Sequence, residues 1–180
     1  MIKRELIVFT IIFLLFVSCK KEDSSTQPPD QIPQITKSSK RGLAYDLKNS
    51  TDLDTLKGGV SWWYNWYHST TAPANYYSTY DIEFIPMLWG GNTSNNDMTI
   101  VKNFILTHSE IKYLLVLNEP NLVDQANRTP VQAAADWVKY EQVVSDLAAQ
   151  QRTTELVGQA INWGTVTYYL DTVVWLDDYS

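Results

Sequence analysis

The chain has 180 residues, of which 44% are hydrophobic and 19% are charged, and this composition is typical of a globular protein. Its formal net charge of −6 disfavours non-specific nucleic-acid binding, which needs a cationic face. The single cysteine, Cys19, excludes an intrachain disulfide framework and any multi-cysteine metal site. The two histidines are not arranged as an HExxH pair, which disfavours a zinc hydrolase. Nothing else in the sequence supplies a cofactor site, so we expect neither a metal ion nor a cofactor. Seven Trp and eleven Tyr are an unusual excess of aromatic residues.

A short apolar segment at the N-terminus, Leu6–Val17, predicts a secretory signal. It is shorter than the roughly 20 residues that a membrane-spanning helix needs. The segment ends at Ser18 and Cys19, and this ending resembles a bacterial lipoprotein signal, although Phe16 stands where that signal usually has Leu or Val. We therefore expect a signal peptide over residues 1–19, acylation of Cys19, and a protein exported across the inner membrane and lipid-anchored at the outer membrane, cell surface or periplasmic face. An ordinary signal peptide with an incidental cysteine is the alternative.

The next segment, residues 20–39, is polar and proline-rich and has few apolar residues to bury. We interpret it as a flexible tether. The folded domain is then expected over residues 40–180.

Apolar segments that predict β-strands alternate with helical or loop segments along this domain. The expected strands are Gly42–Tyr45, Val60–Tyr64, Phe84–Trp89, Tyr113–Leu117 and Leu156–Ile161. The expected helices are Ser50–Lys57, one capped by Asp97, one capped by Thr129 with Pro130 in its first turn, and Tyr168–Tyr179. Pro86 has no N–H to donate, so it calls for a bulge in the third strand.

Alternating strands and helices predict parallel βα units, and polar or aromatic residues follow each strand. This pattern is typical of a (β/α)8 TIM barrel, whose active site lies at the carboxyl ends of its strands. Such barrels have about 250 residues, so we interpret residues 40–180 as about the first five βα units of a truncated α/β barrel. A small doubly wound sheet is the alternative, but the sequence has no Gly-rich phosphate loop.

Glu119 follows the fourth predicted strand, in the sequence Asn118-Glu119-Pro120. A carboxyl group at a strand end beside apolar walls is suited to general acid catalysis, and the Asn118 amide can hydrogen-bond a substrate hydroxyl. Taken alone, the tripeptide favours the alternative that Glu119 is a solvated loop carboxylate.

The aromatic residues favour a carbohydrate ligand. Residues 61–67 include five aromatic side chains, and Trp89 ends the next strand. Flat aromatic faces with polar edges suit sugar rings. Because side chains alternate along a strand, Trp63 cannot share a face with Trp62, Tyr64 and Trp66, so at least one of these residues belongs to the core.

Several segments together resemble glycoside hydrolase family 128, in order from about residue 40 to the end. They are Lys40–Tyr45, Val60–Trp62, Tyr64–Trp66, Glu83–Gly90, Asn118–Leu122, Gln125–Asn127, the helix start at Pro130–Trp137 and Trp175–Tyr179. The resemblance implies a (β/α)8 barrel that cleaves β-1,3-glucan with retention of configuration. It also implies that Glu119 is the general acid/base and that Asn118 is its substrate-orienting neighbour.

The resemblance places the nucleophile, a glutamate, at the end of a seventh strand, beyond residue 180. Within the chain, Glu83 starts a strand, Asp46 belongs to no nucleophile motif and Asp124 follows the motif in a loop. We therefore expect the 180-residue chain to be an inactive fragment of an active hydrolase.

The first hypothesis is a lipid-anchored, monomeric endo-β-1,3-glucanase, and the alternative is a non-catalytic glycan-binding surface lipoprotein on the same scaffold. In both, Trp62, Trp66 and Trp89 are predicted sugar platforms, with Tyr64 and Asn65 as supporting contacts. A structural domain without a ligand would leave the Trp and Asn residues at the strand ends unexplained.

Overall fold

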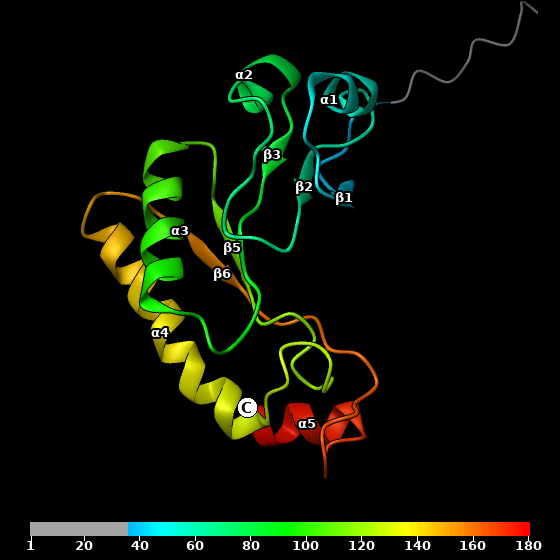
Figure 1. The fold of residues 1–180 in the computed structure, drawn as a ribbon, viewed down its shortest axis with the longest axis vertical. Helices are drawn as coiled ribbons and strands as arrows, with labels where there is room; N and C mark the ends of the chain where they lie inside the picture. The colour runs from blue at the N-terminus through cyan, green and yellow to red at the C-terminus, as the bar shows by residue number, and fades with distance from the viewer. Residues whose placement is uncertain (1–35) are drawn as a thin grey trace, which may run out of the picture. The chain divides into compact units, whose positions relative to one another are not determined.

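The computed structural model describes residues 36–180 (Figure 1). The strands are β1 (Gly42–Ala44), β2 (Trp62–Tyr64), β3 (Glu83–Phe84), β4 (Met87–Leu88), β5 (Tyr113–Val116) and β6 (Glu155–Val157). The helices are α1 (Ser50–Leu56), α2 (Tyr76–Tyr80), α3 (Asn95–Thr107), α4 (Pro130–Ala148) and α5 (Thr172–Tyr179). The expected signal peptide, Cys19 and most of the expected tether lie outside the described residues.

Every strand pair is parallel, which confirms the predicted α/β class with parallel strands. One sheet has the order β1-β2-β3 and the other β4-β5-β6. Backbone hydrogen bonds continue where the two sheets meet: the Ile85 N–H donates to Trp63 over 2.9 Å, and the Leu115 N–H donates to Pro86 over 3.0 Å. The spatial order of the strands therefore follows their order in the sequence.

The strand predicted over Phe84–Trp89 is divided at Ile85 and Pro86 into β3 and β4. β3 pairs with β2, whereas β4 pairs with β5. Because proline has no N–H, it is tolerated where one ladder ends and the next begins. The expected irregularity at Pro86 is therefore present, as a break between two short strands.

The first hydrophobic core lies between the first sheet and the helices α1 and α2. At its centre is Trp63, which is fully buried. The Trp63 ring centroid lies 4.9 Å from that of Tyr76, edge to face, and 5.2 Å from that of Phe84. Trp63 is therefore the aromatic residue of its segment that belongs to the core, as side-chain alternation along β2 predicts.

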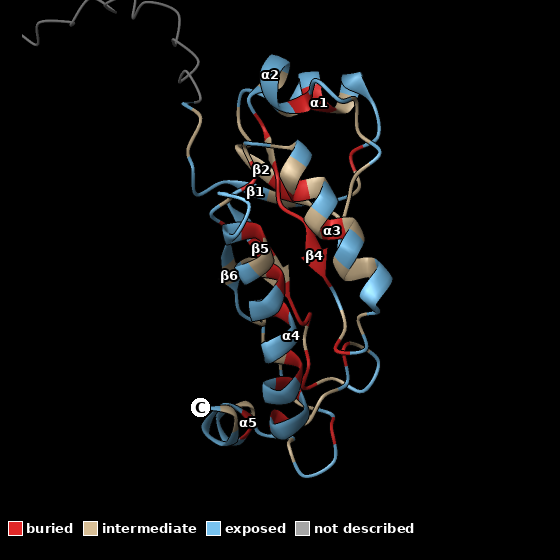
Figure 2. Ribbon diagram, turned by 90° about the vertical axis from the view of Figure 1, so that its left-hand side faces the viewer, coloured by how far each residue is buried: buried red, intermediate tan, exposed pale blue. Residues whose placement is uncertain are grey.

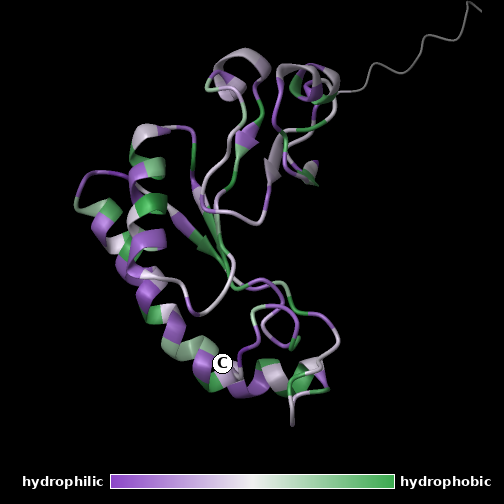
Figure 3. Cartoon of the chain, viewed as in Figure 1, coloured by the Kyte–Doolittle hydropathy of each residue, from purple (hydrophilic) through white to green (hydrophobic). Residues whose placement is uncertain are grey.

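The second core lies between the second sheet and the helices α3 and α4, with Trp175 of α5 at its edge. In Figure 2 the buried residues lie along β4 and β5 and on parts of α3 and α4. Figure 3 shows the matching alternation of hydrophobic and hydrophilic residues along α4. Its buried residues are Pro130, Ala133, Asp136, Tyr140, Val143 and Leu147, so the buried face of α4 includes one carboxylate, Asp136.

Helix starts differ from prediction by a few residues. The cap of α3 is Ser94, and Asp97 is the third residue of its capping box rather than the cap itself. The cap of α4 is Thr129, as predicted, and Gln132 completes a capping box with it. α5 begins at Thr172, capped by Asp171, instead of at Tyr168. The short helix α2 was not predicted, because five residues are too few to show a helical period.

The last residues of the expected tether contact the domain. The Ser38 carbonyl accepts a hydrogen bond from the Ser61 hydroxyl at 2.8 Å, and the Ser39 carbonyl accepts one from the Trp62 indole at 3.0 Å. Lys37 pairs with the Asp81 carboxylate at 3.0 Å. The packed chain therefore begins about three residues before the expected boundary at residue 40. None of the helices within residues 36–180 has both the length and the apolar character needed to cross a membrane.

Candidate active site

A groove of about 510 Å³ lies at the carboxyl ends of the parallel strands. It is lined by Tyr64, Trp66, Trp89, Asn118, Glu119, Gln125 and Ala160. These residues come from the ends of β2, β4, β5 and β6, which the parallel pairing places at one edge. The structure therefore brings together five of the site residues named from the sequence.

Backbone pairing fixes the chain just before Glu119. The Leu117 N–H donates to Leu88 at 3.0 Å, and the Asn118 N–H donates to Trp89 at 2.8 Å. On its other side, Asn118 forms a parallel bridge with Ala160. The Asn118 side chain is buried and its amide donates to Gln125 Oε1 at 3.0 Å. The residue that carries the carboxyl therefore follows directly from an anchored strand end.

Glu119 itself has a left-handed backbone, with φ of 44°, and Leu117 has φ of 56°. Non-glycine residues rarely adopt this conformation, and they keep it only where their surroundings hold them. Here a tight turn does so, because the Leu122 N–H donates to Glu119 at 3.1 Å and the Arg128 N–H donates to Pro120 at 2.7 Å. With this conformation the chain leaves the direction of β5 at Glu119, at the edge of the groove.

The Glu119 carboxyl is half-buried and accepts a hydrogen bond from the side-chain amide of Asn162, with 3.1 Å between Nδ2 and Oε1. Among residues 36–180, Glu119 contributes the only carboxylate that lines this groove.

The other carboxylates considered from the sequence lie elsewhere. Glu83, at the start of β3, lines a different cavity, and burial raises the pKa of its carboxyl. Asp46 pairs with Lys48 at 3.1 Å, and Asp124 is exposed.

The groove has an aromatic wall. The rings of Tyr64 and Trp66 meet edge to face, with centroids 5.2 Å apart. Trp66 and Trp89 are 40% and 37% exposed, so ring surface of both is open to a ligand. Both residues also line a neighbouring cavity of about 640 Å³, to which Asn65 belongs. The aromatic surface thus continues beyond the groove at Glu119.

Trp62 does not line this groove. It pairs with Gly42 and Glu83 at the amino ends of β1 and β3, and it lines an inner cavity of about 710 Å³. Its ring occupies the space that a Cβ atom would need at Gly42. Trp62 was assigned as a sugar platform because it belongs to the aromatic cluster, but its place near the beginning of the strand separates it from the strand ends.

Sequence reasoning gave no role to Asn162, Gln125 or Arg128. Asn162 follows the last strand pairing at Ala160, just as Glu119 follows β5, so the strand-end rule could have identified it. Gln125 and Arg128 lie in the loop after Glu119, and no sequence pattern indicates what their side chains contact.

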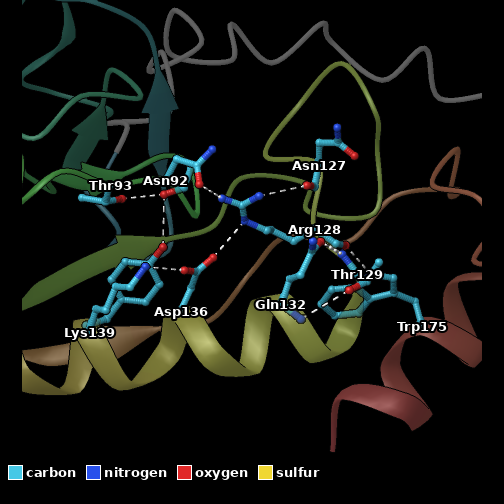
Figure 4. Close-up of polar contacts among 11 residues, drawn as sticks. Asn92, Thr93, Asn127, Arg128, Thr129, Gln132, Asp136, Lys139 and Trp175 are labelled. Carbon is cyan, nitrogen blue, oxygen red and sulfur yellow. Dashed lines mark hydrogen bonds and ion pairs between the residues drawn. The ribbon is translucent and has the colours of Figure 1, made fainter.

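Arg128 joins the loop after β4, the loop after β5 and α4 (Figure 4). Its Nε donates to Asp136 at 2.8 Å, and another guanidinium nitrogen donates to Asn92 Oδ1. Asp136 is largely buried and also pairs with Lys139 at 2.7 Å. The Trp175 indole donates to the Arg128 carbonyl at 2.9 Å, which brings α5 into the same network. This network holds the far end of the loop that begins at Glu119.

We predict that Arg128→Met lowers the free energy of unfolding by about 3 kcal/mol, because a largely buried Asp136 loses its better partner. Urea unfolding of the full-length protein measures the change. The double variant Arg128→Met/Asp136→Leu is the control and should recover part of the loss, since it removes the unpaired charge. A single variant as stable as the wild type would contradict this role of Arg128.

Comparisons with known proteins agree with the resemblance seen in the sequence. The model of the family described as glycosyl hydrolase catalytic core matches residues 42–180. Among curated proteins, none matches this chain.

Three solved structures of GH128 enzymes are similar to the chain. It is 46% identical to a subgroup II endo-β-1,3-glucanase from Pseudomonas viridiflava, with a TM-score of 0.72 over 80% of this chain and 54% of that one. It is 36% identical to a subgroup II endo-β-1,3-glucanase from Sorangium cellulosum, with a TM-score of 0.64 over 77% and 53% of the two chains. It is 32% identical to a subgroup III curdlan-specific exo-β-1,3-glucanase from Blastomyces gilchristii in complex with glucose, with a TM-score of 0.54 and the same coverage, 77% and 53%.

The chain thus spans about half the length of these relatives. The family match covers nearly all of the domain, and the solved structures confirm the resemblance to GH128. The chain belongs to the glycosyl hydrolase catalytic core family, among relatives of the GH128 group.

Proposed function

We propose that the protein is a retaining glycoside hydrolase that acts on β-glucan, as an endo-β-1,3-glucanase. The observation that carries this proposal is the position of Glu119. Its carboxyl lies at the carboxyl ends of parallel strands, in a groove that also contains the exposed rings of Trp66 and Trp89. The similarity to two endo-β-1,3-glucanases at 46% and 36% identity supports the choice of linkage and of internal cleavage.

Glu119 is the proposed general acid/base. It donates a proton to the oxygen of the departing sugar, and in the second step it takes a proton from the water that releases the bound sugar. Asn118 is the proposed orienting neighbour, since it lines the groove beside Glu119.

A retaining mechanism also needs a nucleophilic carboxylate about 5–5.5 Å from the acid. Among residues 36–180, Glu119 is the only carboxylate that lines the groove, and the resemblance to family 128 implies a nucleophile at a later strand; we therefore propose that the nucleophile follows residue 180. The described strands would then be part of a (β/α)8 barrel, and the 180-residue chain alone would not hydrolyse glucan. The greater length of the relatives supports this proposal.

We expect Glu119→Gln, made in the full-length protein, to lower kcat/KM on a soluble β-1,3-glucan by about 10²- to 10⁴-fold, because the variant cannot protonate the leaving oxygen. On a dinitrophenyl β-1,3-glucoside oligomer, kcat/KM of the variant should fall much less, since this leaving group departs without a proton. Glu155→Gln is the matched control, because Glu155 is exposed at the start of β6 and outside the groove.

The result also separates the enzyme from the alternative, a non-catalytic glycan-binding protein. If the full-length wild type binds the glucan without releasing sugar, and Glu119→Gln binds equally well, the binding protein is the correct interpretation. If Glu119→Gln hydrolyses the glucan like the wild type, Glu119 is not the acid.

Trp66 and Trp89 are the proposed sugar platforms, with Tyr64 beside them. We predict that Trp66→Ala and Trp89→Ala each weaken glucan binding about tenfold, or about 1.4 kcal/mol, through loss of ring contact. Isothermal titration calorimetry of the Glu119→Gln protein with glucan oligosaccharides measures binding without turnover. Trp163→Ala is the control, because Trp163 is 81% exposed and does not line the groove. Unchanged affinity in both groove variants would exclude them as platforms.

We also propose that the protein is exported and held at a membrane through an acylated Cys19, as a monomer whose partner is the glucan. The short apolar segment before the sole cysteine supports this proposal. We expect Cys19→Ala to abolish incorporation of labelled fatty acid and to release the protein from the membrane fraction. Fractionation of cells that express either form is the measurement. Incorporation of the label into Cys19→Ala would contradict acylation at Cys19.

A further inference from the structure

Asn162 contacts the Glu119 carboxyl from the neighbouring strand end. Its Nδ2 donates to Glu119 Oε1 at 3.1 Å, while its Oδ1 accepts the backbone N–H of Trp163 at 2.8 Å. Because Oδ1 is occupied by a donor, the amide cannot turn over without losing this bond. The N–H side of the amide therefore faces Glu119.

A second amide holds Asn162 in place. Asn121 is fully buried, its Oδ1 accepts the Asn162 N–H at 3.2 Å, and its Nδ2 donates to the Asn162 carbonyl. The Asn121 carbonyl in turn accepts the Thr165 and Val166 N–H groups at 2.8 and 3.1 Å. These reciprocal bonds join the loop after β5 to the loop after β6. A buried amide whose hydrogen bonds are made is costly to displace, so Asn162 has a fixed position.

We propose that Asn162 is a positioning residue for the Glu119 carboxyl and that Asn121 is its anchor. This inference rests on the proposed function of Glu119 as the acid/base. A glutamate side chain has several rotatable bonds, and a fixed donor on Oε1 restricts them before the substrate arrives.

The same hydrogen bond determines where the catalytic proton resides. Oε1 accepts the amide N–H, so in the acid form the proton is on Oε2. Within residues 36–180, no hydrogen bond engages Oε2. The proton is therefore held on the oxygen that remains available to the leaving group. After transfer, the amide still donates to the resulting carboxylate, which keeps the base in place for the second step.

The test uses Asn162→Asp and Asn162→Ala in the full-length protein, with the two substrates described for Glu119. Asn162→Asp keeps the acceptor for the Trp163 N–H but replaces the amide donor to Glu119 with a carboxyl group. We expect kcat/KM on the soluble glucan to fall about 10- to 100-fold in both variants, a part of the effect of general acid catalysis. On the dinitrophenyl substrate we expect a fall of less than about threefold, since that leaving group needs no proton.

The control is Thr165→Val. The Thr165 hydroxyl accepts the Val123 N–H at 2.9 Å, so it joins the same two loops without contact to Glu119 or to the Asn162 side chain. We expect this variant to keep both activities within about threefold. A thermal unfolding curve for each variant shows whether it folds.

Two results would overturn the inference: wild-type activity of Asn162→Asp on the glucan, or an equal loss on both substrates, which would indicate a general structural role. These outcomes are distinct from failure of the proposed function. If Glu119→Gln shows the leaving-group dependence and Asn162→Asp does not, only the role of Asn162 is wrong. If Glu119→Gln lacks that dependence, the role of Glu119 is wrong, and with it the inference.

Discussion

The parallel pairing of the strand ends is the constraint on which the candidate site depends. The Asn118 N–H bonds to the Trp89 carbonyl on one side, and Asn118 bridges Ala160 on the other. These contacts fix the ends of β4, β5 and β6 at one edge, so the side chains that follow each strand must meet there. The strand bodies are held by apolar packing, which leaves the residues beyond them free to be polar or aromatic. The position of Glu119 in the groove therefore follows from where β5 ends and does not depend on the conformational preference of a glutamate.

The loops at this edge are held by polar contacts instead of an apolar core. Arg128 and Asp136 hold one end of the loop that begins at Glu119, and Asn121 holds the loop after β6 to it. A groove that admits a substrate cannot be covered by packed hydrophobic side chains, so hydrogen bonds must supply the rigidity there. Such bonds hold the loops because removal of one partner leaves the other buried and unpaired, which costs free energy. The cores keep the protein folded, while these contacts keep the site in shape.

The sequence predicted the repeating elements of the fold and most of the groove. Strand positions, the capping box at Thr129 and the parallel class follow from local patterns, and Glu119, Asn118, Trp66 and Trp89 follow from the strand-end rule. Trp62 lies outside the groove, which the sequence could not show, because a cluster of aromatic residues does not indicate how far each one lies from the end of its strand. The roles of Arg128 and Asn121 depend on contacts between distant loops, which no local pattern contains. The start of α5 was misjudged for a similar reason, since a bridge between Val166 and Tyr169 precedes it.

The backbone of the groove shows why rigidity is needed at this edge. Trp66 and Glu119 both have left-handed backbones, with φ of 61° and 44°, and both line the groove. For residues other than glycine this conformation costs about 1–3 kcal/mol, so it persists only where the surroundings leave no alternative. At Trp66 the strained turn follows β2 directly and presents the ring edge to face against Tyr64. At Glu119 it directs the carboxyl to the Asn162 amide. The strand pairing and the polar contacts between loops offset the free energy that these two turns cost. The packed cores hold the strands, and the strands in turn hold the two strained turns at the edge of the groove.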